Sequence, residues 1–400
     1  MRTRSGGIVV LGAGYGGLRA ALTLDRLLSG RSRPALTLVD RLADHQLITE
    51  LHRVATGYLP PVSAALPLDM ALAGTEIMRV QAEVVALDLS ARRVLLAGRP
   101  ALPYSHLVIA LGSIGDDHGV PGVHAHALQL RSLDDARRVW AHLQGIQRAA
   151  GQQETGAAAR AGLTTVVIVG AGWTGIEVAG ELVSLRERGQ VDLHIVLLDA
   201  GAALLPGLPP SLARVAGQFM TAHGIDLRHN HPVVAVADGW VRTTMGEVAA
   251  GTVVWTAGVR GSPVLTDSGL ALDGRGRVCL DPYLRAEGQP DVYVVGDTAR
   301  PAQRELAGSS AVPSAQRALG QGQRAAANLI AGLVGGRPLP WRPHSLGVAL
   351  SLGEDDGALC VGPVIIRRRA AVMLKRAQAD EYARSLSHGS AGRRAQPTMP

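Results

Sequence analysis

Two glycine-rich fingerprints are the parts of this sequence best suited to bind a phosphorylated ligand. The first spans residues 12–17 (Gly-Ala-Gly-Tyr-Gly-Gly), and the second spans residues 170–175 (Gly-Ala-Gly-Trp-Thr-Gly). In such a motif the first glycine permits a tight turn, the second lets the backbone approach a pyrophosphate, and the third brings helix and strand together. Two fingerprints in one chain predict two dinucleotide sites, held so that electrons can pass between them.

Each fingerprint stands where a strand is expected to give way to a helix. An apolar run, a helix-forming run and a second apolar run follow one another in both units: 8–11, 18–24 and 35–39, then 165–169, 176–185 and 194–198. The last run ends both times in an acid, Asp40 or Asp199. Such a carboxylate accepts hydrogen bonds from a ribose diol, while the helix N-terminus offers N–H groups to phosphates. This context favours nucleotide binding over a plain glycine-rich turn.

The length and composition allow two or three domains with cores of their own. The chain has 400 residues, of which 47% are hydrophobic. No uncharged apolar run is long enough to cross a bilayer, so we expect no transmembrane helix. Residues 1–7 lead directly into the first strand and leave no room for a signal peptide, so we expect a cytoplasmic location.

The net charge of +7 is spread along the chain except near the C-terminus. Five basic residues gather there: Arg367, Arg368, Arg369, Lys375 and Arg376. Aromatic residues make up only 3% of the chain, so platforms on which nucleic-acid bases could stack are scarce. We therefore expect no nucleic-acid partner, and the charge is better explained by phosphate-rich ligands or an anionic membrane.

The cysteines and histidines form no recognisable reactive or metal-binding pattern. Cys279 and Cys360 are distant in sequence and there is no Cys-x-x-Cys pair, which argues against a redox disulfide between neighbouring cysteines. The 13 histidines show no His-Glu-x-x-His spacing. We therefore expect no metal site.

Further apolar segments extend the repeat beyond the fingerprints. Strands expected over 104–113 and 252–258 occupy corresponding places in the two units, and a strand over 291–295 ends in Gly296-Asp297. No second half follows this last strand, so we expect it to return to the first unit. Three more elements are expected after it: a helix over 314–333 and short strands over 347–352 and 358–361.

These elements predict an α/β fold with two Rossmann-like, three-layer dinucleotide-binding domains, the first interrupted by the second, and a small C-terminal α+β segment. The expected division is 1–118 for the first part of the interrupted domain, 119–270 for the inserted domain, 271–336 for the returning part, 337–386 for the C-terminal segment and 387–400 for a disordered tail. Residues 148–162 are expected to form a surface loop.

The order of these motifs resembles the two-dinucleotide flavoprotein superfamily and, within it, the type II (non-proton-pumping) NADH:quinone dehydrogenases. The segments that carry the similarity are Asp40-Arg41, His45, Glu50, 54–57, 134–136, 255–258 and 296–299. The resemblance covers roughly residues 7 to 376. It implies FAD at the first fingerprint and NADH as a substrate at the second.

The resemblance also implies a set of cofactor-binding residues. They are Gly12, Gly14, Tyr15, Gly16, Gly17, Asp40, Arg41, Val84, Ala110, Gly112, Gly170, Gly172, Thr174, Gly175, Glu177, Asp199, Ala257, Gly258, Gly296, Asp297, Ala315 and Gln316. Asp297 is expected to accept hydrogen bonds from the ribityl chain, with a plain helix N-cap as the alternative. No arginine for a 2′-phosphate follows Asp199 within residues 200–202, which favours NADH over NADPH.

Three residues are expected to act in catalysis. Glu177 belongs to a Gly-x-Glu-x-Ala-x-Glu-Leu pattern that places it near the nicotinamide ribose, with a solvated or capping carboxylate as the alternative, and Glu181 is expected to be structural. Gln316 opens a run that resembles the family's quinone-site motif, and its amide suits a quinone oxygen. The alternative for Gln316 is a polar residue on an outer helix face. Lys375 is placed near the flavin or the acceptor by the resemblance alone.

The chain departs from the family pattern on the acceptor side. Gly320 stands where the quinone-site motif has the first of two adjacent glutamines. Leu47 and Thr49 replace the aromatic residue and the proline usual between His45 and Glu50. These departures leave room for an acceptor of different shape.

Residues 364–376 occupy the position of the family's C-terminal membrane-associating region. An amphipathic helix over this run would turn Ile366, Ala370, Met373 and Leu374 toward lipid and its basic residues toward anionic headgroups. A helix packed on the flavin domain with a solvated basic face is the equal alternative.

The resemblance implies an enzyme that takes a hydride from NADH onto FAD and passes two electrons to a quinone-type acceptor. A soluble NAD(P)H-dependent reductase with a protein or small non-quinone acceptor stays open, as does a nucleotide-binding regulatory flavoprotein. Sulfide:quinone oxidation fits less well because its chemistry needs paired cysteines near the flavin. Peripheral contact with the inner face of the cell membrane and a homodimer also stay open.

Overall fold

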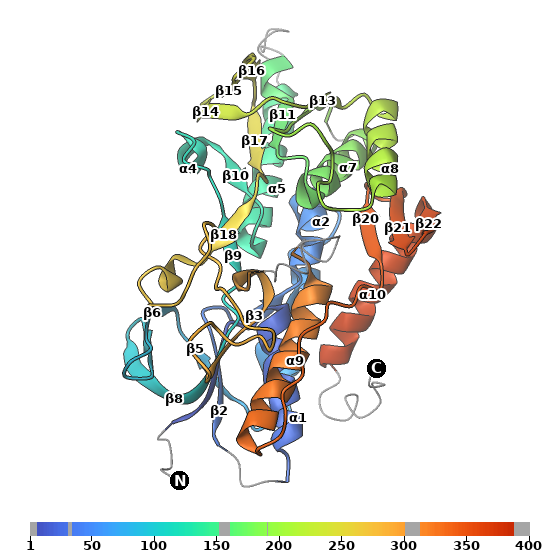
Figure 1. Cartoon of the computed structure of the whole chain (residues 1–400). Helices are drawn as coiled ribbons and strands as arrows, with labels where there is room; N and C mark the ends of the chain where they lie inside the picture. The colour runs from blue at the N-terminus through green and yellow to red at the C-terminus, as the bar shows by residue number, and fades with distance from the viewer. Residues whose placement is uncertain (1–5, 31–33, 152–160, 190, 301–312, 388–400) are drawn as a thin grey trace.

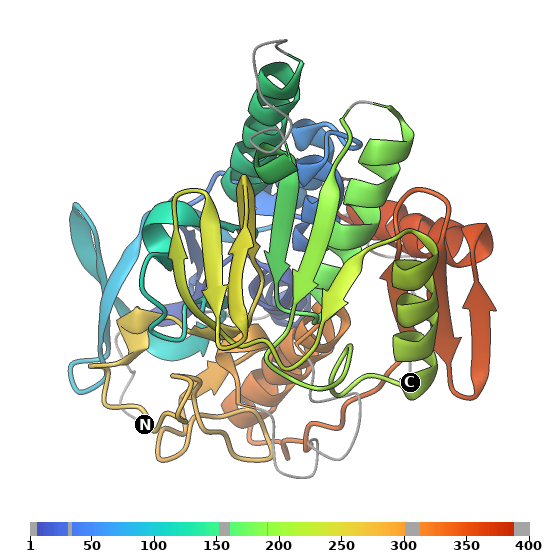
Figure 2. The same ribbon diagram turned by 90° about the horizontal axis from the view of Figure 1, so that it is seen from above.

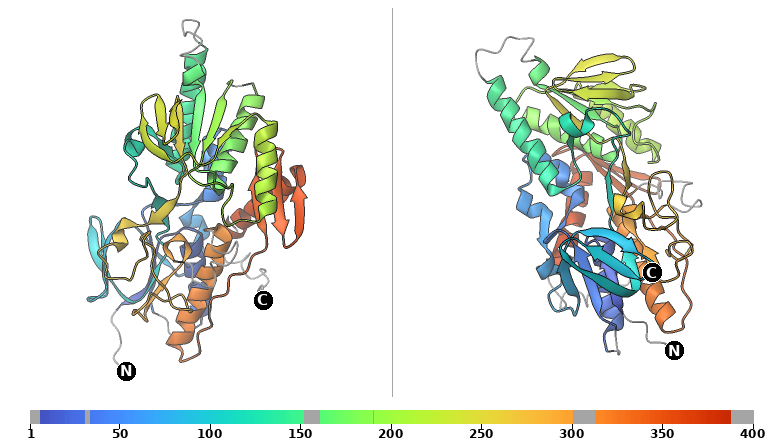
Figure 3. Two further views of the ribbon diagram at one scale, coloured as in Figure 1. Left: turned by 45° about the horizontal axis from the view of Figure 1, so that its top comes forward. Right: turned by 90° about the vertical axis from the view of Figure 1, so that its left-hand side faces the viewer.

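Two α/β units, one built on each fingerprint, are stacked along the molecule, and a smaller C-terminal unit lies beside them (Figures 1 and 3). The computed structural model describes residues 6–30, 34–151, 161–189, 191–300 and 313–387. Each larger unit is organised by its own mainly parallel sheet. The expected α/β class with two nucleotide-binding units is confirmed.

The first sheet has the order β5-β2-β1-β8-β7-β6, and β19 also pairs with β8. Its strands are β1 (Gly7–Leu11), β2 (Leu36–Asp40), β5 (Met78–Gln81), β6 (Val84–Asp88), β7 (Arg93–Leu96), β8 (Arg99–Ile109) and β19 (Val292–Val294). β6 and β7 form an antiparallel extension, and the other pairs are parallel. Because Val292 pairs with Leu107, the chain returns to this sheet after building the second unit, as an interrupted fold requires.

The central strand of the first sheet is apolar throughout because both of its faces are buried. Ile8 and Val10 face the helices α1 (Tyr15–Leu28) and α9 (Ala315–Leu333), while Val9 and Leu11 face the opposite layer. The two helices lie side by side on the sheet (Figure 1). This close approach brings the start of α9 to the fingerprint at the start of α1.

The second sheet is wholly parallel in the order β10-β17-β11-β12-β13. Its strands are β10 (Leu128–Gln129), β11 (Thr165–Val169), β12 (His194–Leu198), β13 (Asp226–Arg228) and β17 (Thr252–Trp255). Val166 and Ile168 face the helical layer, and Val167 and Val169 face an antiparallel layer. That layer holds β14 (Val233–Ala237), β15 (Trp240–Thr243) and β16 (Gly246–Ala249), the yellow strands in Figure 2.

The helical layer of the second unit also packs on the first unit. It consists of α5 (Leu133–Ala150), α7 (Trp173–Glu187) and α8 (Pro210–Ala222). The short helix α2 (Leu51–Ala55) of the first unit packs against both α5 and α7. The remaining short elements are β3 (Asp44–Gln46), β4 (Ala65–Pro67), α3 (Leu68–Ala71), β9 (Ser113–Gly115), α4 (Val123–His126) and β18 (Val259–Gly261). β9 and β18 form the antiparallel ribbon that joins the two units.

The C-terminal unit corrects one expectation. Residues Val364–Arg367 form strand β22 rather than the first turn of a helix, and α10 runs from Arg369 to Ser387. β22 pairs with β21 (Gly357–Val361), which pairs with β20 (Val348–Ser351). The physical reason is the turn at Gly362, whose φ of 56° suits a tight hairpin and places Val361 opposite Val364. Ile366 therefore lies on a strand and shares no helix face with Met373.

Two expectations on connecting segments fall partly outside the described residues. The tail expected from residue 387 begins with the last residue of α10, and residues 388–400 are not described. In the surface loop expected over 148–162, α5 continues to Ala150, and residues 152–160 are not described. Among the described helices, none is long and apolar enough to cross a membrane.

Candidate active site

The two fingerprints form cradles of the same shape. A Cβ atom at Gly17 would lie 1.8 Å from the carbonyl oxygen of Gly12, and one at Gly175 would lie 1.9 Å from that of Gly170, so the third glycine is required in both motifs. The first glycines, Gly12 and Gly170, have φ values of 93° and 106°, which favour glycine. The tight turn expected of each motif is therefore present twice.

The second glycine of each motif faces open space. A Cβ atom at Gly14 or at Gly172 would meet no atom within 4 Å. Both glycines precede the first residue of a helix and have extended backbones, so the helix N–H groups behind them are directed at this space. An anionic phosphate is the group that such an opening suits.

The acid at the end of each second strand makes the same two hydrogen bonds in both units. Oδ2 of Asp40 accepts from Ala13 N and Oδ2 of Asp199 accepts from Ala171 N, each at 2.5 Å. Their Oδ1 atoms accept from a backbone N–H two residues later, at 2.8 Å and 2.7 Å. These bonds fix each carboxylate beside its cradle and use only part of its acceptor capacity, so lone pairs remain for a ribose hydroxyl.

The return segment completes the first cradle. Asp297 lies in a short turn after β19, and its Oδ2 accepts from Ser113 Oγ at 2.9 Å, so it does not act as a helix cap. Nη2 of Arg131 donates to the same Ser113 hydroxyl at 2.6 Å and lies 3.6 Å from Asp297 Oδ2. Residues 113 and 131 thus meet a carboxylate that lies more than 160 positions further along the chain.

The first cradle offers groups that suit FAD, the cofactor that the sequence resemblance implies. Gln321 lies fully buried beside it, where its Oε1 accepts from Gly296 N at 2.8 Å. Its Nε2 atom is buried without a partner among the described residues, so one amide donor is left for a bound ligand. Gly322 lets α9 approach, because a Cβ there would lie 2.2 Å from the Gly16 carbonyl oxygen. The second cradle has no return segment of this kind among the described residues, which suits a nucleotide that binds and leaves.

Glu177 is the centre of a buried polar cluster between α7, β20 and α10. Its Oε1 accepts from Lys375 Nζ at 2.5 Å, from Trp173 Nε1 at 3.0 Å, and from the backbone and hydroxyl of Ser351 at 3.1 Å and 3.2 Å. Burial acts to raise the pKa of Glu177, but the charges of Lys375 and His52 and the hydrogen bonds from Lys375 and Ser351 together outweigh burial, so the pKa is lowered. Glu177 is therefore an ionised carboxylate held between the second unit and the C-terminal unit.

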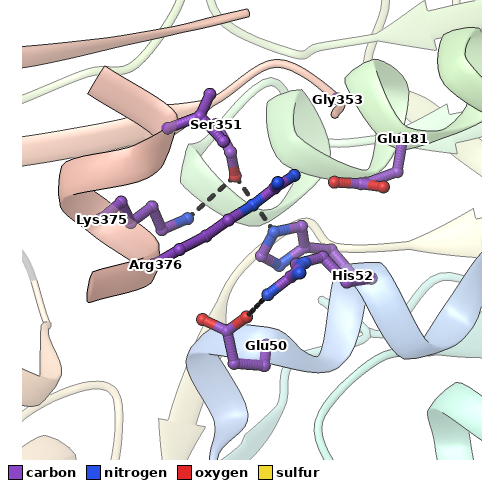
Figure 4. Close-up of a pocket in the computed structure, with 9 residues that line it drawn as sticks. Glu50, His52, Glu181, Ser351, Gly353, Lys375 and Arg376 are labelled. Atoms are coloured by element: carbon purple, nitrogen blue, oxygen red, sulfur yellow. Dashed lines mark hydrogen bonds and ion pairs between the residues drawn. The ribbon is translucent and has the colours of Figure 1, made fainter. Parts of the chain in front are cut away.

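His52 joins this cluster from α2. Its Nε2 lies 3.0 Å from Ser351 Oγ, and its Nδ1 lies 3.6 Å from Glu177 Oε2. Burial lowers the pKa of His52 to about 4, so the ring is neutral near pH 7. Lys375 contacts the same Ser351 hydroxyl at 2.9 Å. Figure 4 shows His52, Ser351 and Lys375 converging from three parts of the chain.

A second buried cluster lies beside the first fingerprint. Nδ1 of His45 donates to the Ala13 carbonyl oxygen at 2.8 Å, which leaves Nε2 to accept from the hydroxyl of Tyr382 at 3.1 Å. The ring of Tyr15 packs against both His45 and Tyr382, with centroid distances of 5.0 Å and 5.1 Å. Burial lowers the pKa of His45 to about 4. α10 is thereby joined to the first unit as well as to the second.

Sequence comparisons identify the family to which these sites belong. The model of the pyridine nucleotide-disulphide oxidoreductases matches residues 6–322. A type II NADH:quinone oxidoreductase of Staphylococcus epidermidis is 30% identical over 92% of this chain and 93% of its own length. The chain belongs to this family of type II NADH:quinone oxidoreductases. An NADH dehydrogenase-like protein of Mycobacterium tuberculosis is 36% identical over 73% of this chain and 72% of its own length.

Solved structures share the fold of this type II oxidoreductase. NDH2 from Plasmodium falciparum, in complex with NADH, matches with a TM-score of 0.83 at 15% identity over 94% of each chain. The sulfide:quinone oxidoreductase from Aquifex aeolicus matches with a TM-score of 0.80 at 18% identity, over 96% of this chain and 92% of that one. The architecture with two cradles and a C-terminal unit is thus common to these proteins.

The residues that depart from the family pattern are packed or hydrogen-bonded in this type II oxidoreductase. The hydroxyl of Thr49 lies 3.0 Å from that of Tyr15, and Leu47 is buried beneath them. A Cβ at Gly320 would lie 2.8 Å from the ring of Trp341, so this tryptophan occupies the place of a longer side chain. Each of these three positions is therefore filled by packing or a hydrogen bond of its own.

The structure brings Glu177 and Lys375 together in one ion pair. Gln316 is half-buried on the first turn of α9 and does not line the pocket beside Glu177. Of the other predicted positions, Ala110 lies beside Gly12 of the first cradle and Ala257 lies beside Gly170 of the second. Arg41 and Gly258 are exposed, Val84 and Ala110 are buried, and Gly112, Thr174, Ala257 and Ala315 are half-buried.

Sequence reasoning missed His52, Ser351, Arg131 and Tyr382. None belongs to a motif, because each reaches its site through packing between segments distant in the chain. One signal was present for Lys375: it is the only lysine among the 40 lysine and arginine residues of the chain. Because arginine is the basic residue at every other such position, a single lysine indicates a position where an ammonium group is needed rather than a guanidinium group.

The two cysteines lie apart in the fold of this type II oxidoreductase. Cys279 and Cys360 are both buried free thiols, the first beside Arg300 and the second beside Ser211. The described residues contain no group of three or more side chains that could hold a metal ion. Neither cysteine therefore provides the paired thiols that sulfide oxidation needs.

Proposed function

We propose that this chain oxidises NADH and reduces a quinone, with FAD held at the first cradle and NADH binding at the second. The observation that carries the proposal is the pair of matching cradles, of which only the first is closed by a return segment among residues that the structure describes. When bound, FAD supplies the redox chemistry by accepting a hydride and releasing two electrons. The protein positions the reactants and handles the accompanying protons.

The residues assigned to FAD act by shape and hydrogen bonding. Gly14 lets the pyrophosphate approach the start of α1, and Asp40 accepts from the ribose of the adenosine half. Asp297 accepts from the ribityl hydroxyls, and Arg131 stabilises its negative charge through Ser113. We assign the permanent cofactor to this cradle because residues from three distant segments enclose it.

The residues assigned to NADH form an open site. Gly172 lies at the opening, and Asp199 is fixed beside it to accept from the adenosine ribose. A 2′-phosphate would meet that carboxylate without a compensating arginine at residues 200–202, so NADH is preferred over NADPH. Ala257 and Gly258 complete this site at the end of β17.

The acceptor is assigned to the region where α9 and α10 approach the first cradle. Gln316 offers an amide that can donate to a quinone carbonyl and accept from the product hydroxyl. Lys375 holds a proton at Nζ near the acceptor, and Glu177 keeps that ammonium in place. Trp341 beside Gly320 gives this region its own shape and tunes which quinone fits.

We further propose the domain limits and membrane contact that the sequence favours. Residues 1–118 and 271–336 form the FAD domain, 119–270 form the NADH domain and 337–386 form the C-terminal segment. Met373 and Leu374 are exposed on α10, 67% and 47%, close to the basic residues at 367–369. This combination of apolar and basic side chains suits contact with an anionic membrane surface.

Anaerobic stopped-flow spectroscopy tests the proposed function. The purified protein should be yellow, NADH should bleach the flavin absorbance much faster than NADPH, and menadione should then restore it. A folded protein that takes up no FAD, or a flavin that NADH leaves oxidised, would overturn the proposal. A reduced flavin that a ferredoxin reoxidises but quinones do not would show that the acceptor is a protein.

A further inference from the structure

A small pocket beside the Glu177 cluster contains polar atoms that the protein leaves unmatched. Its walls come from α2, α7, β20 and α10, and they include Glu50, His52, Glu181, Ser351, Lys375 and Arg376 (Figure 4). Lys375 and Ser351 also contact Glu177. The pocket therefore lies between the Glu177 cluster and the charged side chains of Glu50, Glu181 and Arg376.

Glu181 is the least satisfied of these groups. Its side chain is fully buried, and its Oε1 has no hydrogen-bond partner among the described residues, while Oε2 is 3.5 Å from the Thr56 hydroxyl. The Nε atoms of Arg53 and Arg376 are also buried without a partner there. An unmatched acceptor and two unmatched donors around one polar pocket suit a bound water molecule, which can carry protons.

Burial and the charges that face Glu181 together bring its pKa close to neutrality. Burial raises its pKa to about 7, although Arg53 on α2 and Lys375 on α10 act to lower it. Glu177 on its own helix raises the pKa, and Arg376 lowers it. Glu50 also lines the pocket, paired with Arg53. At neutral pH this carboxyl can therefore both take up and release a proton. A purely structural carboxyl would have hydrogen-bond partners for both of its oxygens and would not require such a pKa.

Ser351 can pass a proton in either direction. Its hydroxyl lies within hydrogen-bond distance of Lys375 Nζ, Glu177 Oε1 and His52 Nε2, at 2.9 Å, 3.2 Å and 3.0 Å. A hydroxyl can donate to the carboxylate while it accepts from the ring, or donate to the ring while it accepts from the ammonium. The lysine is equally suited, because an ammonium can give up its proton whereas a guanidinium stays charged.

The proton balance of the proposed function calls for such a supply. Reduction of a quinone to a quinol takes two electrons and two protons. The hydride from NADH accounts for both electrons and one proton, so the second proton must come from solvent. On the basis of the proposed function, we propose that Glu181 takes this proton from solvent through the pocket. The proton then passes through Ser351 and Lys375 to the acceptor. Glu181 does not contact the acceptor and acts only through these residues.

The half-reactions of the FAD-loaded enzyme separate this inference from the proposed function. Glu181→Gln keeps the size of the side chain but cannot carry a proton, and Glu187→Gln on the exposed end of α7 is the matched control. We expect Glu181→Gln to leave reduction by NADH unchanged but to slow reoxidation by menadione about tenfold. It should also abolish an inflection near neutral pH in the reoxidation rate. Wild-type behaviour in both respects would overturn the inference, whereas a wild-type flavin that NADH cannot reduce would overturn the proposed function.

Infrared difference spectroscopy of the resting enzyme provides a second readout that needs no turnover. A buried protonated carboxyl gives a C=O band that is distinct from the carboxylate bands. In the wild type we expect one such band to disappear as the pH is raised through neutrality, and we expect Glu181→Gln to lack it. The same titrating band in Glu181→Gln, or no band titrating near neutrality in the wild type, would rule out Glu181 as the carrier.

Discussion

Nζ of Lys375 lies 2.5 Å from Oε1 of Glu177, although 198 positions separate the two residues in the chain. The side chains of Lys375 and Glu177 are only 14% and 7% exposed, so the pair has little solvent to screen it. Glu177 belongs to the helix that opens at the second fingerprint, and Lys375 belongs to α10, which also contacts the first unit through Tyr382. The pair therefore links the NADH-binding unit to the side of the molecule where we place the acceptor.

Replacing Lys375 tests the importance of this pair. Lys375→Gln leaves the buried carboxylate of Glu177 without its cation, so we expect the unfolding free energy to fall by about 3 kcal/mol. The pKa of Glu177 should rise for the same reason. Urea denaturation at constant FAD concentration measures the loss, and Arg337→Gln, at an exposed arginine, is the control that should change it little. A loss no larger than that of the control would contradict the assignment of a strong buried pair.

The matching glycines of the two cradles predict opposite cofactor defects. No atom lies within 4 Å of a Cβ at Gly14 or Gly172, so valine at either position should fold but obstruct the approach of a pyrophosphate. Gly14→Val should lose FAD, as measured by flavin absorbance after gel filtration. Gly172→Val should retain FAD and raise the KM for NADH by about tenfold or more, a cost of about 1.4 kcal/mol in binding. If either variant damaged the other nucleotide's site instead, the assignment of the cradles would be wrong.

Local patterns explain why the cradles could be predicted from sequence. A fingerprint, its flanking strands and the following acid lie within about 30 residues, as the βαβ motif requires. β11 and β12 have the bounds that their apolar runs indicate, and the return strand β19 follows from its Gly-Asp ending. The incorrect prediction of a helix over 364–367 also came from a local pattern. An apolar run next to basic residues suits both an amphipathic helix and an edge strand.

The polar clusters could not be predicted in this way. His52 and Ser351 make one hydrogen bond across 299 positions, and nothing in the spacing of either residue indicates the other. Such contacts depend on how α2, α7 and α10 pack, which is a property of the assembled fold. A motif indicated Glu177 and the family resemblance indicated Lys375, but only the structure shows them as partners and gives Glu181 an unmatched oxygen.

Buried neutral histidines predict a loss of stability in mild acid. The pKa values of His45 and His52 are lowered to about 4, whereas in the unfolded chain each is close to 6.5. Between these values the unfolded state binds more protons, so the unfolding free energy falls as the pH drops from 6.5 toward 4. Glu181 acts in the opposite direction, because its raised pKa makes the folded state bind more protons below pH 7.

Single substitutions measure each contribution to this pH dependence. When the pH is lowered from 7 to 5, the unfolding free energy of His45→Gln or His52→Gln should fall by about 2 kcal/mol less than that of the wild type. His194→Gln, at an exposed position, should lose as much as the wild type. Denaturant titrations at the two pH values give these differences. A variant of either buried histidine with the pH dependence of the wild type would show that folding does not lower the pKa of its ring.

Trp341 and Gly320 should behave as a coupled pair. Gly320→Gln restores the residue of the family motif, but its Cβ would lie 2.8 Å from the Trp341 ring, so we expect overpacking to cost about 2 kcal/mol. Trp341→Ala removes the obstacle, and the double variant should be more stable than the sum of the two single losses predicts. Because Gln316 lies one turn before Gly320 on α9, the double variant should also change the KM for menadione more than the KM for NADH. Additive losses of stability, or equal changes in both KM values, would show that Trp341 neither replaces the missing glutamine nor shapes the acceptor site.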